Sequence, residues 1–196
     1  MRLLLVLAHP LADSFAAAVA QAARDTLIAN GHEVDWLDLY REGFDPRLSP
    51  AERGGYFDDP YDASAVAPLV ERLQAAEGLV LVFPQWWFGF PAILKGWFDR
   101  VFAPGVAFAH DPAGGRILPR LGNIRRLHAL TTTGSPWWVV RLVMGDPVRR
   151  VLRRAIAPMC AKGVRFGTTA LHDMDRATPA QRAAHLARVR RVMGRI

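Results

Sequence analysis

Three consecutive aromatic side chains, Trp86, Trp87 and Phe88, form the most informative cluster of this sequence. They follow Pro84 and Gln85, at the end of a short apolar run that predicts a buried strand. The carboxyl ends of parallel strands commonly bind flat ligands, and aromatic side chains bury large areas when they stack with an offset. The cluster therefore favours a site for a flat aromatic cofactor. A core cluster that caps a sheet would use the same residue types.

A second candidate segment lies near the N-terminus, between His9 and Phe15. A helix that begins at Ser14 would offer free backbone N–H groups and the positive end of its dipole, which suit a phosphate or pyrophosphate. His9 could donate a hydrogen bond from a ring nitrogen, and Ser14 could donate one from its hydroxyl group. An ordinary helix cap beside a solvent-facing histidine would have the same local sequence.

The third candidate segment comprises Thr131, Thr132, Thr133 and Gly134. Small hydroxyl residues and a glycine allow a ligand to approach the backbone closely. Backbone N–H groups from Thr133 onwards could stabilise negative charge on such a ligand. A plain turn between a strand and a helix remains the alternative. The three segments together are a stronger signal than any one of them, because each follows a predicted strand.

The elements that would position these segments alternate along the chain between strands and helices. The predicted strands span residues 2–7, 32–37, 78–83, 125–133 and 164–171. The predicted helices span residues 14–29, 62–76, 92–102, 146–161 and 178–193. Residues 40–60 form a long polar loop, and residues 104–122 form an insertion in which two glycines indicate a hairpin turn.

This alternation predicts an α/β protein of one domain, residues 1–196. The best match is a flavodoxin-like, doubly wound, five-stranded parallel sheet of order 2-1-3-4-5, with helices on both faces. In that order the first, third and fourth strands are neighbours, so the three candidate segments meet in one crevice at the sheet edge.

Composition and charge exclude several classes of protein. The single cysteine, Cys160, excludes an internal disulfide and indicates a cytoplasmic setting. No apolar run approaches the ~20 residues of a membrane span, and no spacing of histidines predicts a metal site. The net charge of +7 comes mostly from arginines that are dense towards the C-terminus. They fit solvated helix faces or a field that attracts anionic ligands better than a nucleic-acid surface.

The segment from Phe83 to Phe102 resembles the signature of the NAD(P)H:quinone oxidoreductase family of the DT-diaphorase type. The matching positions are Pro84, Trp87, Phe88, Gly89, Pro91, Ala92, Leu94, Lys95, Gly96, Trp97, Asp99, Arg100, Val101 and Phe102. The run from Leu7 to Phe15, the run from Thr131 to Ser135 and the region from Phe166 to Ala180 extend the resemblance to nearly the whole chain.

The resemblance implies a bound flavin, usually FAD and in some relatives FMN. It also implies NAD(P)H as hydride donor, a small quinone-like acceptor, and a homodimer with its active sites at the subunit interface. By position, the first segment would hold the flavin phosphate region, the aromatic segment would line the isoalloxazine ring, and the third would close its pyrimidine side. The cofactor-binding residues implied in this way are His9, Ser14, Phe15, Pro84, Gln85, Trp86, Trp87, Phe88, Thr131, Thr132, Thr133 and Gly134.

The chain departs from the family pattern in two places. Better-known members carry a tyrosine and a histidine shortly after the third segment, whereas residues 136–145 contain neither. Catalytic side chains are therefore not assigned, and Trp137 or Trp138 is a candidate to replace the missing aromatic wall. Ala16 stands where the family has a polar residue, so one phosphate contact would be missing.

Other functions compete with the quinone reductase interpretation. Some relatives of this family are soluble ancillary subunits of potassium efflux systems, and the basic surface would suit such docking. A flavodoxin-type electron carrier is less consistent with the sequence, because His9 to Ser14 is not the Thr/Ser/Gly-rich phosphate loop of those carriers.

Overall fold

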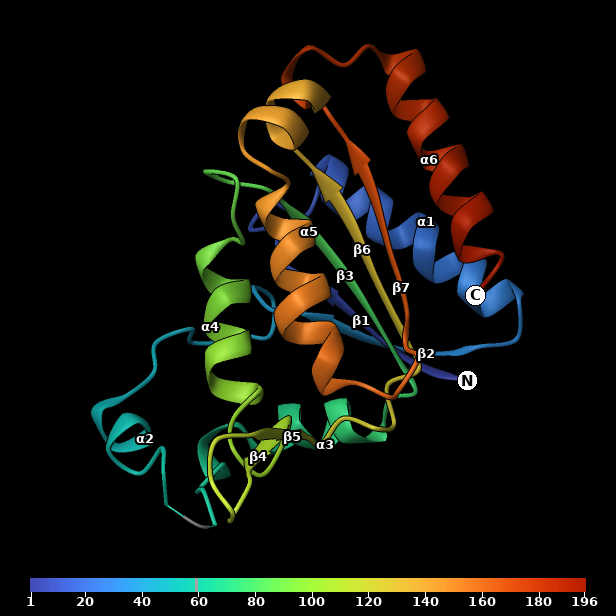
Figure 1. Ribbon diagram of the computed structural model, residues 1–196. Helices are drawn as coiled ribbons and strands as arrows, with labels where there is room; N and C mark the ends of the chain where they lie inside the picture. The colour runs from blue at the N-terminus through green and yellow to red at the C-terminus, as the bar shows by residue number, and fades with distance from the viewer. Residues whose placement is uncertain (59) are drawn as a thin grey trace.

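A parallel five-stranded sheet forms the centre of the computed structural model, which describes residues 1–58 and 60–196 (Figure 1). The strand order is β2-β1-β3-β6-β7, which confirms the predicted order when the five main strands are counted along the chain. Each main strand lies within two residues of its predicted bounds. The observed bounds are Arg2–Leu7 for β1, Glu33–Asp38 for β2, Gly78–Pro84 for β3, Arg126–Thr132 for β6 and Arg165–Leu171 for β7.

Helices cover both faces of the sheet (Figure 1). Helices α1 (Phe15–Ala29) and α6 (Pro179–Met193) pack against each other on one face. Helices α3 (Ala67–Ala75), α4 (Ala92–Val101) and α5 (Pro147–Val151) cover the other face. β3 is buried along its whole length because both of its faces meet helices, which explains why its sequence is apolar throughout rather than alternating.

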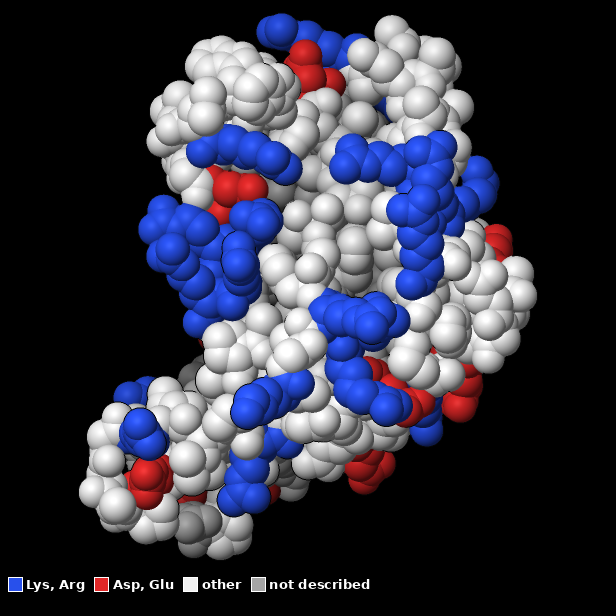
Figure 2. All heavy atoms as spheres, turned by 45° about the vertical axis from the view of Figure 1, so that its right-hand side comes forward, with Lys and Arg blue, Asp and Glu red and all other residues white. Residues whose placement is uncertain are grey.

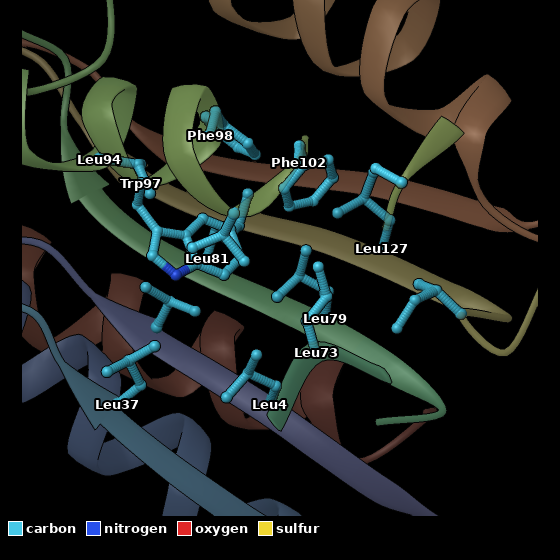
Figure 3. Close-up of a cluster of buried hydrophobic side chains, with 14 of the residues drawn as sticks. Leu4, Leu37, Leu73, Leu79, Leu81, Leu94, Trp97, Phe98, Phe102 and Leu127 are labelled. Atoms are coloured by element: carbon cyan, nitrogen blue, oxygen red, sulfur yellow. The ribbon is translucent and has the colours of Figure 1, made fainter. Parts of the chain in front are cut away.

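The apolar core between α4 and the sheet positions the aromatic segment 86–88, which directly precedes α4. Figure 3 shows Trp97, Phe98 and Phe102 reaching from α4 and its end toward the leucines of β3. Trp97 has no exposed surface, and its ring meets those of Phe98 and Phe102 at centroid distances of 5.4 and 5.3 Å. Burial of such a side chain stabilises the fold by about 3 kcal/mol, so α4 is a firm support for the loop that precedes it.

The segment predicted as the loop 40–60 is not a loop throughout, and residue 59 lies outside the described residues. It contains the short helix α2 (Pro50–Gly54). Glu52 accepts a hydrogen bond of 2.7 Å from Nε of Arg100, and both side chains are buried. Arg100 also donates to the carbonyl oxygen of Asp45. In addition, Pro46 occupies the space that a Cβ atom on Gly96 would need, so the segment lies directly on α4.

Two predicted helices have different shapes in the structure. The helix predicted over residues 146–161 is α5 followed by a π-helical turn (Leu152–Ile156) and a 3₁₀ turn (Ala157–Met159). Pro158 explains why the segment does not end as a regular α-helix, because a proline has no N–H group to continue the α-helical hydrogen bonds. The helix predicted over 62–76 is a 3₁₀ turn (Ser64–Val66) followed by α3.

The structure confirms the hairpin predicted within the insertion at residues 104–122. Strands β4 (Phe108–His110) and β5 (Ile117–Pro119) pair antiparallel to form a small second sheet.

Candidate functional site

Three loops at the carboxyl ends of β1, β3 and β6 form a cleft of about 770 Å³, the aromatic cleft. It is lined by His9, Phe15, Ala16, Pro84, Gln85, Trp86, Trp87, Thr132, Thr133, Gly134, Met174 and Asp175. Nine of the twelve residues implied by the resemblance are in this lining. The predicted meeting of the three segments is thus present in the structure. The binding roles of these residues stay predictions.

The first loop delivers hydrogen-bond donors to the cleft. Ser14 caps α1, and its Oγ accepts a hydrogen bond of 3.1 Å from the N–H of Ala17. Ser14 itself is not in the lining, because its side chain is engaged in the cap. The Nδ1 atom of His9 accepts from the N–H of Leu11 at 3.1 Å, so the proton of a neutral His9 ring resides on Nε2. His9 can therefore donate from Nε2.

The second loop is a tight turn under strain. The N–H of Gly89 donates to the carbonyl oxygen of Trp86 at 2.9 Å, and the two central residues, Trp87 and Phe88, have φ angles of 51° and 58°. This left-handed conformation costs roughly 1–2 kcal/mol for a residue with a side chain. Trp87 is nonetheless 97% exposed, so packing of its side chain within the described chain does not offset the strain at this residue. Strain without a packing reason is typical of functional loops.

The same turn separates the aromatic side chains that the sequence predicted to act together. Trp86 and Trp87 line the cleft, whereas the chain reverses at Phe88 and carries this side chain out of the lining. The ring of Trp86 lies 6.0 Å from that of His9, so the first and second loops are in contact.

Gln85 connects the second loop to the third. Its backbone N–H donates to the carbonyl oxygen of Thr132 at 2.7 Å, and its Nε2 donates to Oγ1 of Thr131 at 3.1 Å. Its Oε1 is buried and has no hydrogen-bond partner among the described residues. Buried acceptors normally have partners, so this oxygen is suited to a ligand N–H group.

The loop after β7 completes the cleft, and the sequence analysis did not find it. The carbonyl oxygen of Thr133 accepts from the N–H of Met174 at 2.9 Å, which draws Met174 and Asp175 to the third loop. A Cβ atom on Gly134 would collide with the carboxylate of Asp175. The glycine therefore leaves room for the Asp175 carboxylate to lie directly against the third loop. Asp175 is the only Asp, Glu, Lys or Arg in the lining.

A second, smaller cavity of about 170 Å³ adjoins the aromatic cleft at Gln85, and we call it the arginine pocket. Its lining comprises Gln85, Thr131, Trp137, Arg141, Asp146, Val148, Arg149, Thr168, Ala170, His172 and Arg188. Thr131, predicted to bind the cofactor, faces this pocket because successive side chains of a strand point to opposite faces of the sheet. Of the two predicted wall residues, Trp137 lines the arginine pocket, and Trp138 is half-exposed and lines neither cavity.

Two histidines lie near these cavities: His172 lines the arginine pocket, and His185 lines neither cavity. Burial lowers the pKa of His172, as do the nearby charges of Arg141 and Arg188, while Asp146 opposes them. Burial lowers the pKa of His185 to about 4, with smaller contributions from Arg188 and His172. The ring of His185 lies 6.0 Å from that of Phe15, so His185 lies behind the first loop of the cleft.

Metal sites and membrane-spanning helices are absent from the part of the chain that the structure describes. No group of three or more His, Cys, Asp or Glu residues within it could hold a metal ion. None of its helices combines the length and the apolar character of a membrane span.

The sequence profile of a family described as having a flavodoxin-like fold matches residues 1–193. The chain belongs to this flavodoxin-like family. YcaK of Escherichia coli (strain K12), an uncharacterized NAD(P)H oxidoreductase, is 39% identical to it over 108 residues, which are 55% of this chain and 55% of the relative. NAD(P)H dehydrogenase (quinone) 1 of Cavia porcellus is 38% identical over 125 residues, which are 56% of this chain and 46% of the relative.

The flavodoxin-like chain thus spans about half the length of these curated relatives. Among solved structures, NAD(P)H:quinone oxidoreductase from Methanothermobacter marburgensis superposes with a TM-score of 0.81 at 28% identity, over 99% of this chain and 96% of that one. These relatives confirm the resemblance to quinone oxidoreductases that the segment from Phe83 to Phe102 predicted.

Proposed function

We propose that this flavodoxin-like chain is a flavin-dependent oxidoreductase that uses NAD(P)H to reduce a small quinone-like acceptor. The observation that carries the proposal is the turn at Trp87, where an almost fully exposed tryptophan is held in a strained conformation at the rim of the aromatic cleft. A large exposed aromatic surface at a cleft suits stacking with flat rings.

The aromatic cleft fits a flavin in size and in chemistry. Its volume of about 770 Å³ lies within the range of about 300–1,000 Å³ that is usual for small-molecule sites. The unpartnered Oε1 of Gln85 would accept from a ring N–H group of the flavin. Nε2 of His9 and the N–H groups at the start of α1 would hold its phosphate. A bound flavin would supply the two-electron redox chemistry.

The residues of the cleft would position the flavin and its substrates and shield them from water. Trp86 and Trp87 would form a wall against which a nicotinamide or a quinone is aligned, and alignment is the main requirement for hydride transfer. The backbone N–H group of Gly134 would stabilise negative charge at the pyrimidine side, because the N–H groups of Thr133 and Ser135 already donate to Leu171 and to the Thr133 hydroxyl group. FAD is the proposed cofactor and FMN the alternative.

A homodimer is part of the same proposal, and an exposed apolar surface on the described chain supports it. Between the third loop and α5, the chain exposes Trp137, Trp138, Leu142, Val143 and Met144 by 41–73%. Clustered exposed side chains of this kind mark interaction sites more often than free surface. Light scattering of the purified protein would test it, and a monomer at micromolar concentration would contradict it. The cytoplasmic setting and the role in a potassium efflux system stay predictions.

The absorption spectrum of the purified protein tests the cofactor. We expect a yellow protein whose flavin, released by heat, is identified by chromatography. We also expect the loaded protein to oxidise NADH or NADPH with a small quinone as acceptor, in the absence of any other protein. A protein that stays colourless after incubation with excess FAD and excess FMN would overturn the proposal.

A further inference from the structure

The arginine pocket lies at the open edge of the sheet, beside the outer strand β7. Figure 2 shows lysine and arginine side chains on both sides of a hollow in this face of the molecule. The pocket receives one arginine from each of three elements. Arg141 comes from the π-helical turn Val139–Val143, Arg149 from α5 and Arg188 from α6.

The charge of this pocket is unbalanced. Three arginines face one aspartate, Asp146, which leaves a net charge of +2 in a cavity of about 170 Å³. The contact from Arg141 Nε to Asp146 Oδ2 is long, at 3.9 Å. Within residues 1–58 and 60–196, neither Arg149 nor Arg188 has a carboxylate in ion-pair range. Like charges gathered without counterions repel each other, so this arrangement is suited to an anion.

His172 adds a donor on the β7 side of the same pocket. Its Nδ1 atom is buried and has no hydrogen-bond partner among the described residues. Buried polar atoms are nearly always partnered in folded proteins. His172 lines the pocket, and a neutral ring with its proton on Nδ1 could donate to an anion there.

We propose that the arginine pocket binds a doubly charged phosphate group. A phosphate distributes its oxygens in several directions, which matches guanidinium groups that reach the pocket from three elements, whereas a carboxylate offers its two oxygens in one plane. The charge of a phosphate monoester near pH 7, about −2, matches the net charge of the pocket. The small volume admits such a group but not a ring system of the size of a flavin.

The phosphate could be inorganic phosphate or the 2′-phosphate of NADPH, because Gln85 belongs to the walls of both cavities. Binding of inorganic phosphate is independent of the proposed redox function. The second source rests on that function, because it needs a nicotinamide dinucleotide in the aromatic cleft. The two sources are distinguished by separate measurements.

The first measurement is calorimetric titration of the purified protein with inorganic phosphate, in the absence of any nucleotide. We expect saturable binding that weakens at least about tenfold in the double variant Arg149→Gln/Arg188→Gln. The matched control is Arg154→Gln/Arg191→Gln, which removes the same charge from neighbouring turns of the chain outside the pocket and should leave phosphate binding within about twofold.

The second measurement compares the dissociation constants of NADPH and NADH for the same proteins. If the pocket takes the 2′-phosphate, the pocket variant loses preference for NADPH and the control keeps it. If the preference is unchanged but phosphate binding is lost, free phosphate is the ligand. If neither dinucleotide binds, the proposed function is wrong, and the titration with inorganic phosphate still tests whether the arginine pocket binds phosphate. A pocket variant that alters neither phosphate binding nor the NADPH preference, or a control that loses as much, would overturn the proposal.

Discussion

The aromatic cleft and the arginine pocket share Gln85 but are built by different means. The cleft consists of loops at the carboxyl ends of β1, β3, β6 and β7, and it offers aromatic surface, hydroxyl groups and backbone N–H groups. The pocket consists of long side chains from helices that flank the edge strand β7, and it offers guanidinium groups. The fold determines where a cleft built from loops lies. A pocket built from long side chains depends on the particular residues of this sequence.

The most severe test of the cleft is Gly134→Val. A side chain here would displace the carboxylate of Asp175 and occupy space in the cleft that both residues line, so we expect flavin affinity to fall by at least about a hundredfold. Fluorescence titration with FAD and FMN would measure the loss, and urea denaturation would verify the fold. Gly122→Val is the matched control, because nothing lies within 4 Å of a Cβ atom on Gly122. Yellow absorbance like that of the wild type in purified Gly134→Val would contradict the role of this loop.

His185 offers a test of the region between the two cavities. Burial lowers its pKa to about 4 from 6.5, and the nearby charged and titratable groups that lower it further are Arg188 and His172. Well above pH 6.5 the ring is neutral in both the folded and the unfolded state. As the pH falls from 6.5 towards 4, the unfolded chain binds the proton first, so the folded state loses stability.

We expect His185 to account for a loss on the order of 2 kcal/mol in the free energy of unfolding over this range, at about 1.4 kcal/mol per pKa unit. His185→Leu should remove that part of the acid sensitivity in urea denaturation at pH 7 and pH 4.5. The exposed His110→Leu is the control. An equal drop in stability for the wild type and His185→Leu would show that this side chain is not the cause.

Trp87→Ala separates function from stability in the cleft. Because the side chain is 97% exposed, we expect the free energy of unfolding to change by no more than about 0.5 kcal/mol. We expect reduction of the flavin by NAD(P)H in stopped-flow measurements to slow about tenfold, since the aligning wall is lost. Phe57→Ala, which removes an exposed aromatic side chain elsewhere, should leave this rate unchanged. An unaltered rate in Trp87→Ala would remove Trp87 from the site.

The smallest expected effect comes from Asp175→Asn. This substitution removes the only formal charge from the lining of the aromatic cleft and makes its electrostatics closer to those of the arginine pocket. We expect the anionic flavin to bind about threefold more tightly at low salt, and the gain to shrink at high salt. Asp25→Asn on α1 is the control. Weaker binding in Asp175→Asn would instead make this carboxylate a hydrogen-bond acceptor for the ligand.

The sequence predicted the sheet and most of the cleft because both follow from short-range patterns. Apolar runs such as Gly78–Pro84 mark strands, and the order of the strands then determines which loops are neighbours. It did not predict that Met174 and Asp175 line the cleft. Backbone hydrogen bonds to Thr133 and Ser135 bring this loop to the cleft, and no local sequence pattern indicates such bonds. The turn at Phe88 was missed for another reason, because left-handed φ angles are rare for aromatic residues.

The arginine pocket could not be predicted at all from the sequence. Arg141, Arg149 and Arg188 are three among many arginines, and nothing in their spacing distinguishes them from those on solvated helix faces. Their convergence depends on the packing of α5 and α6 beside β7, and on the irregular π-helical turn that carries Arg141. Tertiary packing therefore selects which arginines face a common cavity.

The glycine in the run Lys95-Gly96-Trp97 has a consequence for the comparison of related sequences. This residue is small because Pro46 crosses α4 directly above it, some fifty positions earlier in the chain. A homologue with a bulkier residue at the equivalent position must route its segment before α2 elsewhere, even if its cofactor contacts are intact. The residue aligned with Gly96 would then predict, from sequence alone, whether the segment before α2 in a homologue follows the same path as it does here.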